Sequence, residues 1–144
     1  MSLKISELGT NAELLALKRR VTQEHINCYA SASGDFNPIH VNPEFAKKTQ
    51  FGGTVAHGML ILAYLFEFMT NNFGKKWLNS GSLNARFKGA AYPQDTITIT
   101  GKVTSIEKEG NLIIVECDVL CYNQKNEPII KCTTKVKGKN DEDS

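Results

Sequence analysis

The chain has 144 residues, of which 41% are hydrophobic and 22% are charged, and its formal net charge is +2. This length and composition are typical of one globular domain that buries a core without disulfides or metals. The small, scattered charge gives no indication of a nucleic-acid-binding surface. No membrane-spanning helix is expected, because the main apolar run begins at Met59 and stops at Glu67, short of the roughly 18 residues needed.

The cysteines indicate a reducing compartment. They lie at positions 28, 117, 121 and 132, and no two of them form a C-x-x-C pair. The first nine residues lack the apolar segment of a signal peptide. We therefore expect a cytoplasmic protein with free thiols, the last three on inward faces of strands, where cysteine behaves as a small hydrophobic residue.

The pattern predicts a single domain over residues 13–137. Residues 1–12 are expected to form a loosely attached lead-in, and residues 138–144, which are mostly polar, a disordered tail. The segment 14–21 favours a strand, with Leu15 and Leu17 on one face.

Two short helices are expected next. Thr22 is a suitable N-cap for the first, and Gly34 would end it, because glycine readily adopts the left-handed conformation common after a helix. Asn42 and Pro43 mark the start of the second, over residues 44–48. The segment 35–40 would then be a loop beyond a helix end.

A third helix is predicted from Val55 to about Asn71. Between Met59 and Phe66 it has no polar face, and a helix that is apolar all round must be buried on every side. In a domain this small, either a sheet wraps around the helix or a partner subunit covers it.

The second half of the chain predicts strands joined by turns. A hairpin connection is expected at residues 108–111 and a further turn at 123–126. The strand segments alternate apolar and polar residues, at least in part. They are Trp77–Phe87, Thr96–Thr100, Ile113–Cys121 and Ile130–Val136.

The candidate chemistry lies between the first two helices. Asp35 and His40 are five residues apart, and a carboxylate and an imidazole on one loop can hold a water molecule and move its protons. Pro38 would stiffen the loop, and Asn37 would hydrogen-bond local backbone. On the residues alone, an ordinary turn with Asx hydrogen bonds remains the alternative.

The start of the long helix is the second candidate feature. Backbone N–H groups there can stabilise an enolate oxygen, and Gly58 would let an acyl carbonyl approach closely. His57 is either a helix-start residue satisfied by backbone or a catalytic residue. Tyr29 is first a core residue, although it can point into the site.

Three further polar residues are candidates for a ligand entrance. Arg86, Lys88 and Tyr92 would meet phosphates there. The alternative is that they are solvated strand ends.

Two of these motifs resemble a known family. The run from Tyr29 to His40, with Ala46 after it, is similar to the hydratase-2 signature of (R)-specific enoyl-CoA hydratases in the MaoC-like dehydratase group. The segment 56–60, AHGML, looks like that family's helix-start motif. The segments 86–87 and 92–96 resemble its later strand and turn.

The resemblance implies an α+β hotdog fold, in which an antiparallel sheet wraps around a long central helix, and a homodimer or higher homo-oligomer. It implies that Asp35 and His40 are the catalytic dyad and that the Gly58 N–H is the oxyanion donor. Asn37 matches a loop-supporting residue. We also assign support or substrate binding to Pro38, His57 and Tyr29.

The implied activity is reversible syn hydration of a trans-2-enoyl-CoA to the (R)-3-hydroxyacyl-CoA. No metal or organic cofactor is required, because the thioester itself acidifies the α-carbon. The same site would serve a 3-hydroxyacyl-carrier-protein dehydratase of fatty-acid or polyketide synthesis. A non-catalytic acyl-thioester-binding partner subunit is the alternative from another class, and a hotdog thioesterase is less favoured.

Overall fold

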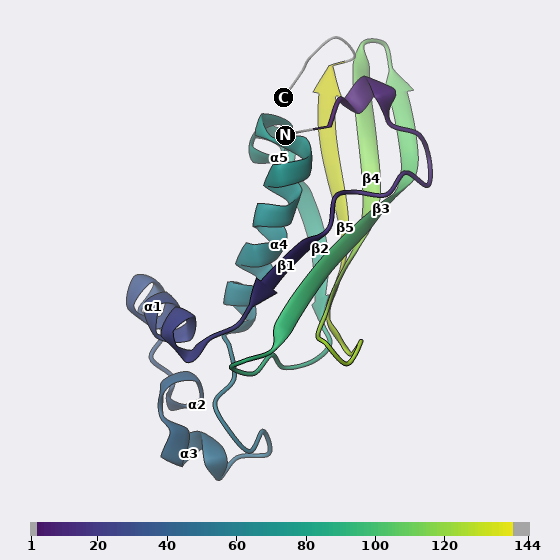
Figure 1. Cartoon of the computed structure of the whole chain (residues 1–144). Helices are drawn as coiled ribbons and strands as arrows, with labels where there is room; N and C mark the ends of the chain where they lie inside the picture. Colours follow the sequence, from purple (N-terminus) through teal and green to yellow (C-terminus); the bar gives the residue numbers. More distant parts are fainter. Residues whose placement is uncertain (1–2, 140–144) are drawn as a thin grey trace.

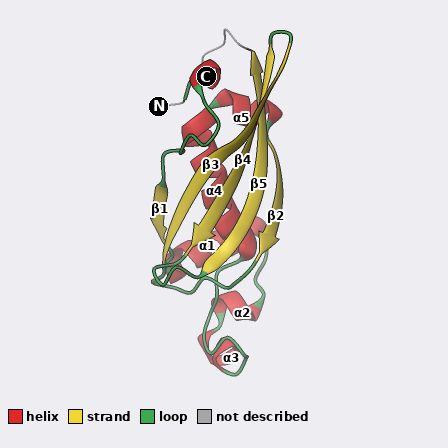
Figure 2. Cartoon of the chain, turned by 90° about the vertical axis from the view of Figure 1, so that its right-hand side faces the viewer, coloured by secondary structure: helices red, strands yellow, loops and turns green. Residues whose placement is uncertain are grey.

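A five-stranded antiparallel sheet of order β1-β3-β4-β5-β2 packs against one long helix, α4 (Figures 1 and 2). The computed structural model of the chain describes residues 3–139. The strands are β1 (Leu17–Arg20), β2 (Ser82–Phe87), β3 (Thr96–Glu109), β4 (Leu112–Tyr122) and β5 (Pro128–Lys139). The helices are η1 (Ile5–Glu7), α1 (Gln23–Ser33), α2 (Pro38–Val41), α3 (Pro43–Lys47), α4 (Gly58–Phe73) and α5 (Lys75–Ser80). The expected α+β architecture, a sheet around a central helix, is confirmed.

The strands follow the predicted alternation. In β4 the apolar positions 113, 115, 117, 119 and 121 are all buried. The β3–β4 hairpin turns at Gly110, whose φ of +61° is a conformation that glycine adopts without strain. One face of the sheet therefore meets α4, and the other carries the polar side chains.

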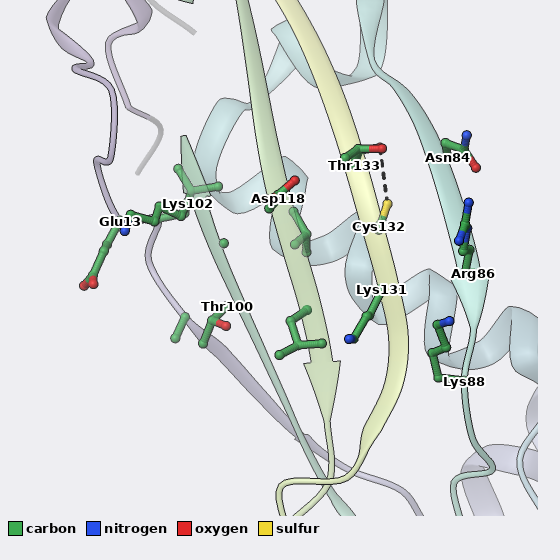
Figure 3. Close-up of a pocket in the computed structure, with 15 residues that line it drawn as sticks. Glu13, Asn84, Arg86, Lys88, Thr100, Lys102, Asp118, Lys131, Cys132 and Thr133 are labelled. Carbon is green, nitrogen blue, oxygen red and sulfur yellow. Dashed lines mark hydrogen bonds between the residues drawn. The ribbon is translucent and has the colours of Figure 1, made fainter. Parts of the chain in front are cut away.

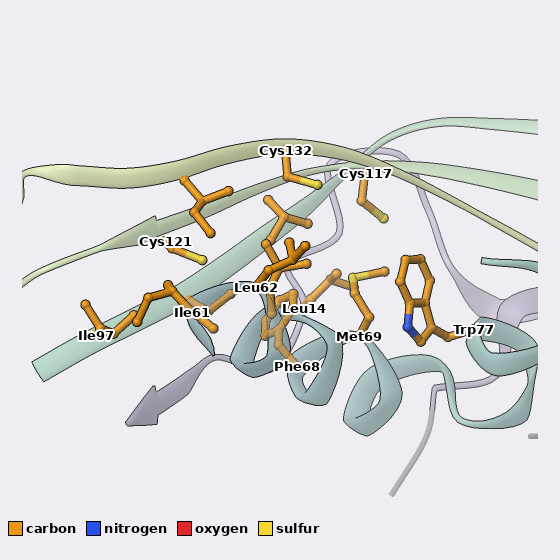
Figure 4. Packing of buried hydrophobic residues seen from close by; sticks show 14 of the residues in the cluster. Leu14, Ile61, Leu62, Phe68, Met69, Trp77, Ile97, Cys117, Cys121 and Cys132 are labelled. Atoms are coloured by element: carbon orange, nitrogen blue, oxygen red, sulfur yellow. The ribbon is translucent and has the colours of Figure 1, made fainter. Parts of the chain in front are cut away.

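Helix α4 is buried on the side that faces the sheet. Phe68 lies among the buried residues between the helix and the sheet (Figure 4). A Cβ on Gly101 of β3 would come within 3.0 Å of its ring. On the other side Met59 is 56% exposed and Phe66 is 43% exposed. Of the two arrangements expected for this helix, burial by the sheet alone does not occur, because the sheet covers only one side of it; cover of the other side by a partner subunit stays a prediction.

The caps of the short helices lie where the sequence predicted them. The Thr22 hydroxyl accepts the His25 N–H (3.0 Å), and Gly34 ends α1 with φ of +80°. The Asn42 side chain accepts the Phe45 N–H (3.2 Å) at the start of α3. One expectation fails: His40 lies in the single turn α2 rather than in a loop, because Asn37 and the proline after it begin a helix.

Both ends of the domain are more ordered than expected. Ile5 of the lead-in is buried in the core, and the Leu3 N–H donates to the Asn72 carbonyl (2.7 Å). At the other end Gly138 and Lys139 extend β5, and the remaining residues assigned to a tail lie outside the described residues. The expectation that residues 1–12 are loosely attached is therefore wrong for the described part of this segment, because its apolar side chains pack inward.

Two predicted strands are shorter than expected. The first covers only Leu17–Arg20, because the Leu15 N–H donates to the Asn72 side chain (2.9 Å) instead of the sheet. Trp77 belongs to helix α5, and β2 begins only after Gly81. None of the described helices is long and apolar enough to cross a bilayer.

The four cysteines should differ sharply in reactivity. Burial raises the pKa of Cys117 and Cys132 to about 11 and that of Cys121 to about 12, whereas Cys28 is exposed. Since the thiolate is the nucleophile, we expect a thiol reagent at pH 8 to label one cysteine quickly and the other three only on unfolding. Mass spectrometry of the labelled protein measures this. Rapid labelling of all four in the folded protein would contradict it.

Candidate active site

The end of α1, the turn α2 and the start of α4 meet at one point. Asp35, His40 and His57 each offer a ligand atom there, and these atoms lie within 4.8 Å of one another. The His40 and His57 rings stack, with centroids 3.8 Å apart and an interplanar angle of 25°. The Tyr29 ring packs on His57 at 4.8 Å. The structure thus brings together four residues that the sequence singled out.

A backbone carbonyl sets the tautomer of His40. Its Nδ1 lies 2.7 Å from the Val55 carbonyl oxygen. A carbonyl can only accept a hydrogen bond, so Nδ1 carries the hydrogen and Nε2 keeps its lone pair. A neutral His40 is therefore oriented with Nε2 available as a base.

His57 contacts both Asp35 and His40 from the interior. Its Nε2 lies 3.0 Å from the Asp35 carbonyl and donates to it by the same reasoning. The residue is only 3% exposed, and its Nδ1 has no hydrogen-bond partner among the described residues. His57 therefore holds the backbone of Asp35 while its ring packs against His40.

The Asp35 carboxylate belongs to a chain of local hydrogen bonds. It accepts the Asn37 N–H (3.2 Å), and the Asn37 side chain in turn accepts the Ile39 N–H (3.1 Å). Pro38 is the first residue of α2, where its missing N–H costs nothing. The segment before His40 thus makes the local backbone hydrogen bonds expected of Asn37, and its stiffening by Pro38 stays a prediction.

Gly58 is the first residue of α4. The N–H groups of a first helical turn have no partner within the helix, and His57 makes no side-chain cap here. A pocket of about 360 Å³ lies beside Gly58, with walls that include Val55, Ile61 and Phe87. The Gly58 N–H has no hydrogen-bond partner among residues 3–139, and a free donor beside an apolar pocket suits a carbonyl oxygen that gains negative charge.

Phe87 occupies the space that a side chain at position 58 would need. An alanine Cβ there would lie 2.6 Å from Cε2 of the Phe87 ring. Since alanine is favourable in a helix, we expect Gly58→Ala to fold normally but to displace the ring and lower kcat roughly 10²-fold. Turnover by Gly58→Ala and by the double variant Gly58→Ala/Phe87→Ala measures this. An equally low rate in both would rule out the steric explanation.

Two groups at the site were not predicted. Gln23 donates to the His40 carbonyl (2.8 Å) and accepts from the Thr54 hydroxyl (2.7 Å), joining α1 to α2 and to the segment before α4. The Val55 carbonyl orients His40. Neither has a clear sequence signal, because one is an ordinary first-turn residue and the other acts through its backbone.

Two of the three residues proposed for a ligand entrance lie together. Lys88 lines the pocket beside Gly58, and it also lines a second pocket on the opposite face of the sheet together with Arg86. Tyr92 belongs to the turn before β3, where its N–H donates to the Asp95 carboxylate (2.9 Å).

Asp35, His40 and His57 are also residue types that ligate metals, and each imidazole has one nitrogen free of a carbonyl. The absence of a metal requirement stays a prediction.

Comparison with known proteins gives the family. The MaoC like domain matches residues 9–122. An (R)-specific enoyl-CoA hydratase of Aeromonas caviae is 32% identical over 113 residues, which cover 76% of this chain and 79% of the relative. A mitochondrial 3-hydroxyacyl-[acyl-carrier-protein] dehydratase of Arabidopsis thaliana is 29% identical over 118 residues, covering 82% and 70%. The 3-hydroxyacyl-thioester dehydratase Z of Mycobacterium tuberculosis is 35% identical over 95 residues, covering 63% of each chain.

Solved structures share the fold. The MaoC-like dehydratase from Rhodospirillum rubrum superposes with a TM-score of 0.81 at 21% identity, over 96% of this chain and 97% of that one. The (R)-hydratase of A. caviae gives 0.75 at 21% identity, over 91% and 96%. These relationships confirm the hotdog fold and the predicted enzyme class, a hydratase or dehydratase. The chain belongs to the MaoC-like domain family.

Proposed function

We propose that the chain catalyses the reversible, (R)-specific hydration of trans-2-enoyl-CoA to (R)-3-hydroxyacyl-CoA. The observation that carries this proposal is the orientation of His40, whose Nδ1 donates to Val55 and whose Nε2 is left as a base close to Asp35. The named activity of the A. caviae relative supports the choice of reaction.

In this mechanism a water molecule lies between the Asp35 carboxylate and His40 Nε2. One of these groups takes a proton from the water as its oxygen bonds to C3, and a proton is delivered to C2. The thioester oxygen gains charge during the attack and is stabilised by the Gly58 N–H. Because both proton-handling groups lie on one side of the substrate, water adds with syn geometry. Which of the two groups moves which proton is left open.

The exposed side of α4 supports a homodimer or higher homo-oligomer. Met59 and Phe66, seven residues apart on one face of the helix, leave an apolar surface exposed there. Surfaces of this kind commonly mark protein–protein contacts.

A single domain over residues 13–137 and a cytoplasmic location also remain part of the proposal.

Crotonyl-CoA tests the activity directly. Wild-type protein is expected to remove the ultraviolet absorbance of the conjugated thioester and to yield the (R)-alcohol, with no free thiol. An (S)-alcohol product would overturn the stereochemistry, and thiol release without hydration would indicate a thioesterase. Thioester binding without turnover, restored by a second protein, would favour the partner-subunit alternative.

A carrier-protein dehydratase is the second candidate. The A. thaliana relative, which is named for that substrate, matches 82% of this chain. The two activities share one site chemistry and differ in the carrier. Comparing kcat/KM for crotonyl-CoA and the crotonyl thioester of an acyl carrier protein decides between them.

A further inference from the structure

A groove of about 950 Å³ runs across the face of the sheet that α4 does not cover. Its walls include outward-pointing side chains from neighbouring strands (Figure 3). Arg86 on β2, Lys131 on β5 and Lys88 just beyond β2 lie together at one end. We call these three residues the basic strip.

The basic strip carries charge that the chain does not neutralise. Arg86 and Lys131 lie directly opposite each other in the β2–β5 register, and like charges at such a position destabilise a sheet. Within residues 3–139, none of the three side chains forms a hydrogen bond or an ion pair. The acidic groups of the groove lie farther across the sheet, Asp118 on β4 and Glu13 beside β3. An unneutralised arginine–lysine pair is suited to an anionic ligand.

The basic strip adjoins the candidate active site. Lys88 lines both the groove and the pocket beside Gly58. Phe87 lies between Arg86 and Lys88 in sequence but points the other way, against Gly58. The end of β2 thus presents a wall of the apolar pocket on one face and cations on the other. A flexible chain leaving the pocket past Lys88 would arrive at Arg86 and Lys131.

These features match a molecule with an apolar reactive end and an anionic far end. Coenzyme A and acyl carrier proteins both attach their acyl group through a flexible pantetheine arm that ends in a phosphate. Arginine binds phosphate with a bidentate fork, and lysine adds a point charge. We propose that the basic strip binds the phosphate end of the thioester's pantetheine carrier. This inference rests on the proposed function.

The test compares substrates with and without phosphate. Arg86→Gln and Lys131→Gln are each expected to raise KM for crotonyl-CoA about tenfold, with kcat unchanged, since one charge-assisted contact is lost. Phosphate-free crotonyl-pantetheine should be unaffected. The control is Lys135→Gln, which removes the same charge from the same face of β5, opposite Ser82 and outside the groove. The proposal would be overturned if the two variants raised KM equally for crotonyl-pantetheine, or if Lys135→Gln raised KM for crotonyl-CoA as much as they do.

Calorimetric binding of CoA separates this proposal from the activity itself. If the wild type binds CoA through the basic strip but never hydrates crotonyl-CoA, the proposed function fails and the strip stands. If it hydrates crotonyl-CoA and the two variants behave as wild type, the strip fails and the function stands.

Two further substrates identify the source of the phosphate. If the Arg86 and Lys131 variants raise KM for crotonyl-CoA but not for crotonyl-dephospho-CoA, the basic strip binds the 3′-phosphate of the nucleotide. If KM rises equally for crotonyl-CoA, crotonyl-dephospho-CoA and a crotonyl carrier protein, the basic strip binds the pantetheine phosphate that both kinds of carrier share. Either result supports the basic strip as a phosphate site.

Discussion

Asp35→Asn and His40→Gln are each expected to lower kcat for crotonyl-CoA roughly 10²- to 10⁴-fold, the range for losing a positioned general acid or base. Asparagine preserves the shape of Asp35 and can still accept the Asn37 N–H. Glutamine at position 40 removes the imidazole that Val55 orients. Initial rates from the loss of thioester absorbance measure the effect, and thermal unfolding confirms that both variants fold.

Two neighbouring substitutions control for nonspecific loss. Glu24→Gln and His25→Gln make the matching changes, a carboxylate to its amide and a histidine to glutamine, in the first turn of α1, where both residues are exposed. They should keep nearly wild-type rates. Wild-type-like turnover by both dyad variants would refute the assignment. The double variant should have a kcat close to that of the less active single variant, because the two groups act on one water molecule.

Phe68→Ala is expected to lower the free energy of unfolding by about 3–5 kcal/mol, the range for removing a buried aromatic ring. Phe68 is fully buried, and its ring fills the space that Gly101 leaves open in β3. Urea unfolding followed by circular dichroism measures the difference.

Phe66→Ala, two residues earlier on the same helix, is the matched control. Its ring is 43% exposed and makes an edge contact with Trp77 at 5.7 Å. In a monomer, Phe66→Ala should lower the free energy of unfolding by about 1 kcal/mol. A cost for Phe66→Ala that grows with protein concentration would support a subunit packed on this side of α4. A Phe68→Ala cost below that of Phe66→Ala would contradict the packing.

The sequence predicted local structure best where a residue's own chemistry decides the conformation. Thr22, Gly34 and Asn42 act on backbone within a few residues, so their capping roles could be read without a fold. The strands after residue 96 were recognised because alternation records burial directly, but their lengths were not: the first was expected over Thr96–Thr100 and runs on to Glu109. Trp77 misled because a large aromatic residue is compatible with a strand or with a helix that packs on one.

The candidate site was predicted in part. Asp35 and His40 are near in sequence, and their meeting with His57 followed from a family resemblance. The roles of Gln23 and Val55 could not be predicted. They depend on hydrogen bonds between segments 15 to 31 residues apart, which exist only once the tertiary structure is formed.

The strand order has a consequence for how the chain folds. β3, β4 and β5 are consecutive hairpins, whereas β1 and β2 reach their partners only after long stretches of chain have been ordered. Closing a long loop costs more entropy than closing a hairpin, so the three-stranded meander is expected to form early and the edge strands late. The segment that carries the dyad lies between those two edge strands in the sequence. A partly folded chain would therefore hold most of its sheet yet lack a working site.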